Sequence, residues 1–134
     1  MTELRVGVAG LGTVGGGLVK LLATQRSVIE ERCGLSVLVT AVSAKDRSRE
    51  RGFDLGGAVW HDDAVSLAKD ENVDVVCELI GGIGGVALAV CEAAIHESKH
   101  VVTANKAMMA VHGARLATLS EDKGVGIHYE AAVA

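Results

Sequence analysis

Proline is missing from this sequence of 134 residues, although average usage of about 5% would place roughly seven in a domain of that length. Long apolar runs are missing as well, because no stretch approaches the ~20 residues that a membrane-spanning helix needs. Lysine and arginine form no cluster and the formal net charge is −4, so we expect neither a nucleic-acid partner nor a membrane surface. The length suits one domain with a buried core.

Paired cysteines and a secretory signal are also missing. The three cysteines, Cys33, Cys77 and Cys91, are odd in number and widely spaced, and the five histidines show no ligand spacing. A disulfide framework or a zinc site is therefore not expected. The N-terminus has no basic segment followed by a long apolar stretch, which is the pattern of a signal peptide. These absences favour a reduced, cytoplasmic location.

Glycine is abundant instead, with 17 residues. The most informative ones follow the strand-like run Leu4–Ala9 and form Gly10-Leu11-Gly12-Thr13-Val14-Gly15, after which an apolar helical pattern begins. In such a G-x-G-x-x-G turn the first glycine permits the tight turn, the second lets a pyrophosphate approach, and the third lets the helix pack on the strand. The N–H groups at the helix N-terminus then face the phosphates. The setting predicts a nucleotide site rather than a glycine-rich turn without a ligand.

Strand and helix patterns alternate along the whole chain. The first helix is expected from Thr13, with an apolar face of Val14, Leu18, Leu21 and Leu22. Further strands are expected at residues 36–44, 58–60, 73–80, 100–103 and 125–129. Between them we expect a helix capped by Asp62 or Asp63 and running to Glu71, a helix that buries Ala87, Val90, Cys91, Ala94 and Ile95, and a helix that ends at Lys123 before Gly124.

Near-continuous apolar strands that alternate with amphipathic helices predict a mostly parallel sheet with helices on both faces. The expected fold is therefore α/β, of the Rossmann-type doubly wound class, and residues 1–134 form one NAD(P)-binding domain. The strand order should reverse next to the first strand, and ligands bind at that point, beyond the carboxyl ends of the strands. The residues that matter should lie directly after the strands.

The end of the second strand bears on the choice of cofactor. An NAD-preferring domain usually carries an acidic residue there, which accepts hydrogen bonds from the ribose hydroxyls. Here the small residues Ser43 and Ala44 come first, followed by Lys45, Asp46 and Arg47. Lys45 or Arg47 can pair with a 2′-phosphate and would favour NADP, whereas Asp46 keeps NAD open. The alternative is that this charged run is only a solvated surface loop.

Two further strand ends carry candidate residues. After the fourth strand, the backbone of Ile80, Gly81 and Gly82 can approach the ribose or nicotinamide side of a cofactor, and Glu78 within the strand is interpreted as a hydrogen-bonded structural carboxylate. After the fifth strand come Ala104, Asn105 and Lys106. Asparagine can orient an amide or hydroxyl, and lysine can stabilise a developing alkoxide or a carboxylate. Equally, Asn105 can be a helix cap and Lys106 a solvated side chain.

Four of these pieces resemble one family, homoserine dehydrogenase, in its order and spacing over nearly the whole chain. The pieces around Asn105 and Glu130 are more specific than the glycine turn. The sequences that carry the resemblance are Val8-Ala9-Gly10-Leu11-Gly12-Thr13-Val14-Gly15, Glu78-Leu79-Ile80-Gly81-Gly82, Val102-Thr103-Ala104-Asn105-Lys106-Ala107 and Tyr129-Glu130-Ala131-Ala132-Val133.

The resemblance implies an NAD(P)-dependent oxidoreductase that interconverts L-aspartate 4-semialdehyde and L-homoserine in threonine, methionine and isoleucine biosynthesis. It implies that Lys106 contacts cofactor or substrate, and that Glu130 and the carbonyl of Val133 help to bind a monovalent cation, usually sodium. Its full-length members continue into a catalytic and dimerisation region, and we expect the chain alone to be inactive and the full-length enzyme to be a homo-oligomer. The cofactor-binding set predicted on all these grounds is Gly10, Gly12, Thr13, Val14, Gly15, Ser43, Lys45, Arg47, Ile80, Gly81, Gly82, Ala104, Asn105 and Lys106.

Two alternative functions come from other classes. One is a different oxidoreductase of the same architecture in aspartate-family metabolism, such as aspartate-semialdehyde dehydrogenase. That chemistry needs a nucleophilic cysteine in a polar setting, and Cys77 in a strand and Cys91 on an apolar helix face are poor candidates. The other is a non-catalytic nucleotide-sensing domain, which would need no asparagine–lysine pair after the fifth strand.

Overall fold

A computed structural model describes residues 2–46 and 55–129 of the chain. Its sheet has six strands in the order β3-β2-β1-β4-β5-β6, and every neighbouring pair is parallel. The strand order reverses at β1, as predicted, so the fold is the Rossmann-like α/β arrangement. The strands are β1 (Thr2–Ala9), β2 (Leu35–Ser43), β3 (Val59–Trp60), β4 (Val75–Glu78), β5 (His100–Thr103) and β6 (Ile127–Tyr129).

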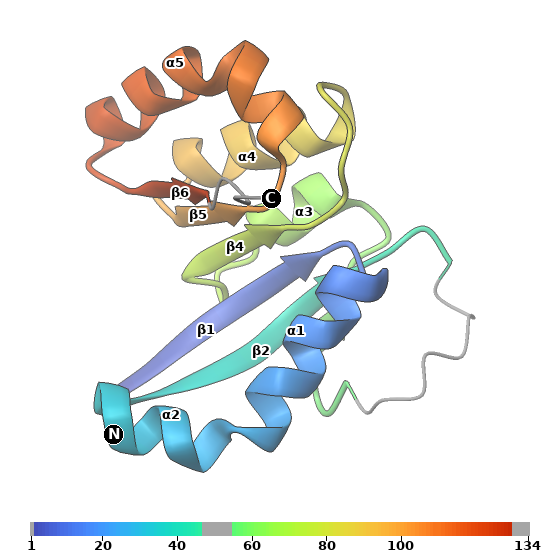
Figure 1. The fold of residues 1–134 in the computed structure, drawn as a ribbon, viewed down its shortest axis with the longest axis vertical. Coiled ribbons are helices and arrows are strands. Elements are labelled where there is room, and N and C mark those ends of the chain that lie inside the picture. Colours follow the sequence, from blue (N-terminus) through green and yellow to red (C-terminus); the bar gives the residue numbers. More distant parts are fainter. Residues whose placement is uncertain (1, 47–54, 130–134) are drawn as a thin grey trace.

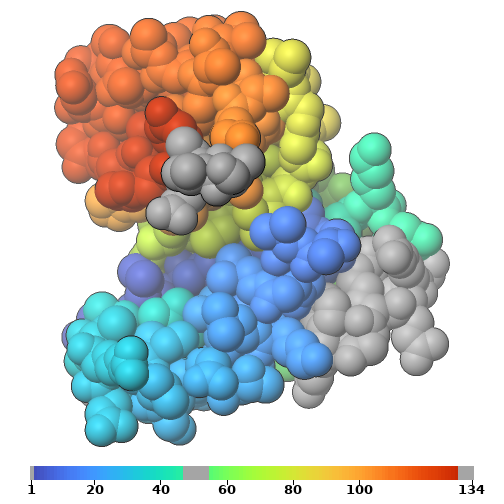
Figure 2. All heavy atoms as spheres, viewed as in Figure 1, coloured from blue at the N-terminus to red at the C-terminus, as the bar shows by residue number. Residues whose placement is uncertain are grey.

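Helices cover the sheet from both sides (Figure 1). On one side a core of Val6, Val8, Leu11, Val19 and Val42 joins α1 to β1 and β2. The core on the opposite side joins α3, α4 and α5 to β1, β4 and β5. The helices are α1 (Thr13–Thr24), α2 (Arg26–Cys33), α3 (Ala64–Ala68), α4 (Val86–His96) and α5 (Lys106–Lys123). Figure 2 shows this division on the molecular surface, where the blue N-terminal part fills one half and α5, in orange, lies in the other.

Alternating side chains of one strand enter different cores. Val8 packs with α1, whereas the next residue, Ala9, packs in the core of α3 and α4, as the two-residue period of a strand requires. Gly7 is buried within the same strand because α3 lies close to it. A Cβ atom on Gly7 would lie 2.7 Å from Cδ2 of Leu67. The sheet is therefore covered closely on both faces at β1, where the ligand should bind.

Two elements were predicted closely. β5 has the expected bounds, and α5 begins after Asn105 and ends at Lys123 before Gly124, whose φ is +68°. The predicted buried face of α4, with Ala87, Val90, Cys91, Ala94 and Ile95, is also confirmed. Other elements are shorter than expected, because α3 stops at Ala68, β4 covers Val75–Glu78 and β6 begins at Ile127.

The predicted apolar face of α1 is wrong for two of its four residues, because Leu18 and Leu22 are half-buried but Val14 and Leu21 are not. Val14 and Leu21 are 60% and 52% exposed, while Gly15, Gly16 and Val19 are buried. Glycine has no side chain, so the edge of the helix that carries Gly15 can come closest to β1 and turns Val14 outward. The helix α2 was not predicted at all. None of its residues is buried, so no apolar stripe marks it.

None of the helices in the described part of the chain is long and apolar enough to cross a membrane.

Candidate dinucleotide-binding site

The three glycines of the turn after β1 have three different physical roles. Gly10 has φ +102°, and a Cβ atom there would lie 2.7 Å from the carbonyl oxygen of Leu79. A Cβ on Gly15 would lie 1.8 Å from the carbonyl oxygen of Gly10. Gly12 has an ordinary φ of −75°, and a Cβ there would meet nothing within 4 Å. Gly10 and Gly15 are therefore required by the protein itself, whereas Gly12 leaves open space for a ligand at the start of α1.

A cavity of about 550 Å³ opens beside this turn, which is within the range of small-molecule and cofactor sites. It brings together the ends of β1, β2, β3 and β4 and the start of α4. The N–H of Gly10 donates a hydrogen bond of 2.8 Å to the carbonyl of Ser43, which ties the first two of these ends together. The lining residues are Gly10, Leu11, Gly12, Ser43, Ala44, Lys45, Asp46, Asp62, Asp63, Ala64, Leu79, Ile80 and Val86.

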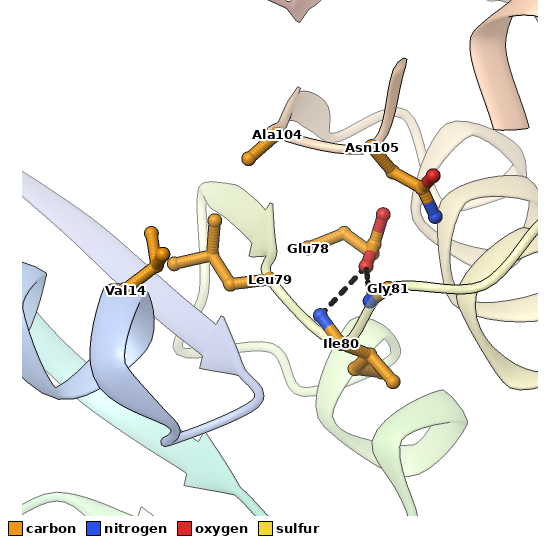
Figure 3. Close-up of a pocket in the computed structure, with 7 residues that line it drawn as sticks. All are labelled: Val14, Glu78, Leu79, Ile80, Gly81, Ala104 and Asn105. Atoms are coloured by element: carbon orange, nitrogen blue, oxygen red, sulfur yellow. Dashed lines mark hydrogen bonds between the residues drawn. The ribbon is translucent and has the colours of Figure 1, made fainter. Parts of the chain in front are cut away.

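A second cavity of about 200 Å³ continues from the first, since Leu79 and Ile80 line both. It lies between the start of α1 and the ends of β4 and β5 (Figure 3). Its lining residues are Val14, Glu78, Leu79, Ile80, Gly81, Ala104 and Asn105. The two cavities together form an extended site along the carboxyl edge of the sheet, as a dinucleotide with two separate ends would need.

Glu78 is the structural carboxylate that the sequence predicted. Its side chain is fully buried, and its Oε2 accepts hydrogen bonds of 2.8 and 3.2 Å from the backbone N–H groups of Ile80 and Gly81. Its Oε1 accepts a hydrogen bond of 2.7 Å from the hydroxyl of Thr103. All three partners are donors, so the geometry suits an ionised carboxylate, which must be hydrogen-bonded when it is buried.

Asn105 is a helix cap and also part of the site. Its Oδ1 accepts a 3.0 Å hydrogen bond from the N–H of Met108 in the first turn of α5, and its own N–H donates to the hydroxyl of Thr103 at 3.0 Å. Its Nδ2 donates to the carbonyl of Gly82. The predicted helix cap is therefore confirmed. The capping side chain also lines the smaller cavity, and its role toward a ligand stays a prediction. Lys106 is exposed at the first position of α5.

The structure gathers most of the predicted residues into the two cavities. Gly10, Gly12, Ser43, Lys45 and Ile80 line the larger one, and Val14, Ile80, Gly81, Ala104 and Asn105 line the smaller one. Of the predicted residues within 2–46 and 55–129, those that line neither cavity are Thr13, Gly15, Gly82 and Lys106.

Three predicted residues lie outside the described part of the chain, namely Arg47, Glu130 and Val133. Among the residues that are described, no group of three or more histidine, cysteine, aspartate or glutamate side chains could hold a metal ion.

Sequence reasoning missed Asp62 and Asp63 as lining residues. The side chain of Asp63 caps α3 by accepting a 3.0 Å hydrogen bond from the N–H of Val65, which is the role the sequence suggested. Both residues also line the larger cavity because β3 pairs with β2 and its carboxyl end lies at the same edge. The strand expected at residues 58–60 already placed both aspartates close after the end of a strand.

The buried cysteines are unsuited to nucleophilic catalysis. Burial raises the pKa of the Cys77 thiol to about 11. Burial, with the charges of Glu78 and Glu92, raises the pKa of Cys91 to about 12. Only the thiolate is a nucleophile, so both groups are inert thiols at neutral pH. This disfavours the alternative function that needs a catalytic cysteine.

Comparison with known proteins agrees with this geometry. Residues 10–130 match the family model described as "Homoserine dehydrogenase, NAD binding domain". Homoserine dehydrogenase of Pseudomonas aeruginosa is 40% identical over 134 residues, which are 100% of this chain and 30% of that protein. The Bacillus subtilis enzyme is 38% identical, again over 100% of this chain and 31% of that protein.

Solved structures show the same likeness. The crystal structure of a homoserine dehydrogenase from Thiobacillus denitrificans superimposes with a TM-score of 0.88 at 34% identity, covering 98% of this chain and 30% of that one. The chain thus spans about a third of the length of the relatives it matches. It belongs to the homoserine dehydrogenase family and is the NAD-binding domain of such a protein.

Proposed function

We propose that this domain binds NAD or NADP in the two joined cavities and supports hydride transfer between the cofactor and L-aspartate 4-semialdehyde or L-homoserine in a longer protein. The phosphates would lie at Gly12 and the N-terminus of α1, the adenosine half in the larger cavity, and the nicotinamide half toward the smaller one. The bound nicotinamide supplies the hydride chemistry, while the protein supplies binding, orientation and charge.

The observation that carries this proposal is the contrast between Gly12 and its two neighbours in the motif. A glycine is needed at Gly10 for its backbone angle and at Gly15 for close packing. Neither reason applies to Gly12, which is exposed and has room for a side chain. Open space above N–H groups at a helix N-terminus fits a phosphate that must approach the backbone closely.

Titration of the parent chain and of Gly12→Val with NAD+ and NADP+ tests the proposal. The valine fits the folded chain but occupies the space of the pyrophosphate, so we expect the dissociation constant to rise at least about tenfold, which corresponds to ~1.4 kcal/mol. The control is Gly17→Ala, also at an exposed position with open space around it, which should bind as the parent does. Parent-like binding by Gly12→Val would contradict the phosphate site.

Two finer features of the proposal rest on the sequence. Lys45, at the rim of the larger cavity, would favour NADP together with Arg47, although Asp46, Asp62 and Asp63 line the same cavity. The resemblance further implies a sodium ion at Glu130 and Val133 in the longer protein. Both of those residues lie outside the described part of the chain, so no step of the reaction is assigned to the ion.

A further inference from the structure

The loop that follows β4, Leu79–Gly82, has a backbone that depends on outside support. Gly81 and Gly82 are both exposed and have φ values of +92° and +88°, and glycine is the residue with the greatest backbone freedom. The loop is held at two places by polar side chains. Glu78 accepts from the N–H groups of Ile80 and Gly81, and Asn105 donates to the carbonyl of Gly82.

These two supports are joined by Thr103. Its hydroxyl donates to Oε1 of Glu78 at 2.7 Å and accepts from the N–H of Asn105 at 3.0 Å. Thr103, Glu78 and Asn105 are 1%, 0% and 8% exposed, so water does not compete for these bonds. The result is a continuous hydrogen-bonded chain from the loop after β4, through Glu78 and Thr103, to Asn105 and back to the loop.

Stability alone does not explain this network. A fully buried carboxylate carries a desolvation penalty, and apolar residues of similar volume often replace buried charges without loss of stability. The network nevertheless converges on a loop that lines the smaller cavity, where Glu78, Ile80, Gly81 and Asn105 all contribute. The network fixes the shape of the lining of the smaller cavity, which is the part of the site that the proposed function assigns to the nicotinamide half.

We propose that Thr103 and Asn105, acting with Glu78, are positioning residues that hold the loop Leu79–Gly82 in the shape that receives the nicotinamide half of the cofactor. This inference rests on the proposed function. It predicts a separation between the two halves of the ligand, because ADP contacts the glycine turn and the larger cavity but has no group that reaches the smaller one.

Two substitutions break the network at different points. Thr103→Val keeps the shape of the side chain and removes the hydroxyl, whereas Thr103→Ser keeps the hydroxyl and should behave as the parent. Asn105→Asp keeps an oxygen for the N–H of Met108 and so keeps the helix cap, but it places a second oxygen against the carbonyl of Gly82. The control is Thr118→Val, on the exposed part of α5.

The measurement is the dissociation constant of each folded variant for NADH and for ADP, with thermal unfolding as the check of folding. We expect Thr103→Val and Asn105→Asp to weaken NADH binding about tenfold, as they would if only a tenth of the molecules held the loop in place. ADP binding should stay at the parent value, and Thr103→Ser and Thr118→Val should match the parent for both ligands.

Equal losses for NADH and ADP would show a merely structural network and overturn the inference, as would unchanged NADH binding in both Thr103→Val and Asn105→Asp. If Thr103→Val does not fold, Asn105→Asp decides alone, since it retains the cap. A parent chain that binds ADP but gains nothing from the nicotinamide half would overturn the inference and the placement of the nicotinamide half at the smaller cavity, but not the phosphate site at Gly12. A parent chain that binds neither ligand would overturn the proposed function as well.

Discussion

The carbonyl oxygen of Gly10 leaves no room for a side chain at Gly15 in α1, because a Cβ atom on Gly15 would lie 1.8 Å from that oxygen. No real Cβ contact is that short, and the atom in the way is backbone, which cannot move aside as a side chain can. Close packing of the helix on the turn is therefore a property of the apo fold and does not depend on a ligand.

Gly15→Ala should accordingly be destabilising rather than simply non-binding. Overpacking a buried position typically lowers the free energy of unfolding by about 1–3 kcal/mol. Urea unfolding of the parent and the variant measures this difference. Gly17→Ala, two residues along the same helix and in open space, is the matched control. Its free energy of unfolding should rise by up to about 1 kcal/mol, because alanine is a better helix former than glycine. Equal stability of the two variants would contradict the packing role of Gly15.

How much of the fold could be predicted from the sequence depended on whether the signal was a local cap or an apolar periodicity. The bounds of α5 were predictable because Asn105 and Gly124 mark its ends, and a cap is a local feature. The buried face of α1 was not predictable from apolar periodicity, because the helix packs through Gly15 and Gly16. Helix α2 was missed because it buries nothing, although Gly34, in the left-handed conformation at its end, was a usable stop signal.

The site shows the same limit. The glycine turn and the residues after β2, β4 and β5 followed from the motif and from the rule that ligands bind at the carboxyl edge. The hydrogen bond between Glu78 and Thr103 could not be predicted in this way, because the two residues are 25 positions apart in the sequence. They meet only because they are register partners in β4 and β5. A sheet register is a property of the assembled fold.

Lys45→Ala tests the preference for NADP. Lys45 is exposed at the rim of the larger cavity, and a hydrogen bond between charged groups contributes about 1.5–3 kcal/mol, so NADP+ affinity should fall by about tenfold or more while NAD+ affinity stays constant. Isothermal titration with both cofactors measures this, and Lys69→Ala, an exposed lysine that lines neither cavity, is the control. Equal losses of affinity for NAD+ and NADP+ would show that Lys45 acts through general electrostatic attraction and not on the 2′-phosphate.

The cysteines should react very differently with a thiol reagent. Cys33 is exposed, whereas burial raises the pKa values of Cys77 and Cys91 to about 11 and about 12. At pH 8 we expect dithionitrobenzoate to modify one thiol rapidly in the folded chain and all three after unfolding in guanidinium. Cys33→Ser should abolish the rapid phase. A rapid reaction that persists in this variant would mean that a buried thiol is accessible and would reopen the possibility of a cysteine nucleophile.

Asp74 should make folding stability depend on pH in the acidic range. The guanidinium of Arg5 contacts its carboxylate at 2.7 and 3.0 Å, and this hydrogen-bonded pair lowers the pKa of Asp74 below the value of 3.8 for an unfolded aspartate. Because the unfolded chain binds the proton more readily, this contribution is complete above pH 3.8 and is lost as the pH falls through the lower folded pKa.

Asp74→Asn should remove that part of the acid dependence. Urea unfolding at a series of pH values from 7 down to 3 would give a shallower slope for the variant than for the parent near the acid end. Asp122→Asn, at an exposed position on α5, should keep the slope of the parent. A parent and an Asp74→Asn variant that lose stability in parallel would show that the ion pair contributes nothing measurable, as exposed pairs sometimes do.

Lys106 is expected to act on the reaction rather than on cofactor binding. It begins α5 directly after Asn105, the capping residue that lines the smaller cavity, and we propose that its ammonium group stabilises negative charge that develops on the substrate oxygen. Removing one such preorganised donor costs roughly 10²–10³ in rate. In a full-length protein that carries this domain, Lys106→Ala should therefore lower kcat by about that factor and change the dissociation constant for NADPH little. Lys123→Ala, at the other end of α5, is the control for loss of a lysine from this helix. Near-normal kcat in Lys106→Ala would show that this lysine takes no part in the reaction.

The domain alone should produce no NAD(P)H from homoserine, because it spans only about a third of the length of its relatives. An assay of purified residues 1–134 with homoserine and either cofactor measures this. Activity in residues 1–134 alone would mean that the complete site lies within this chain.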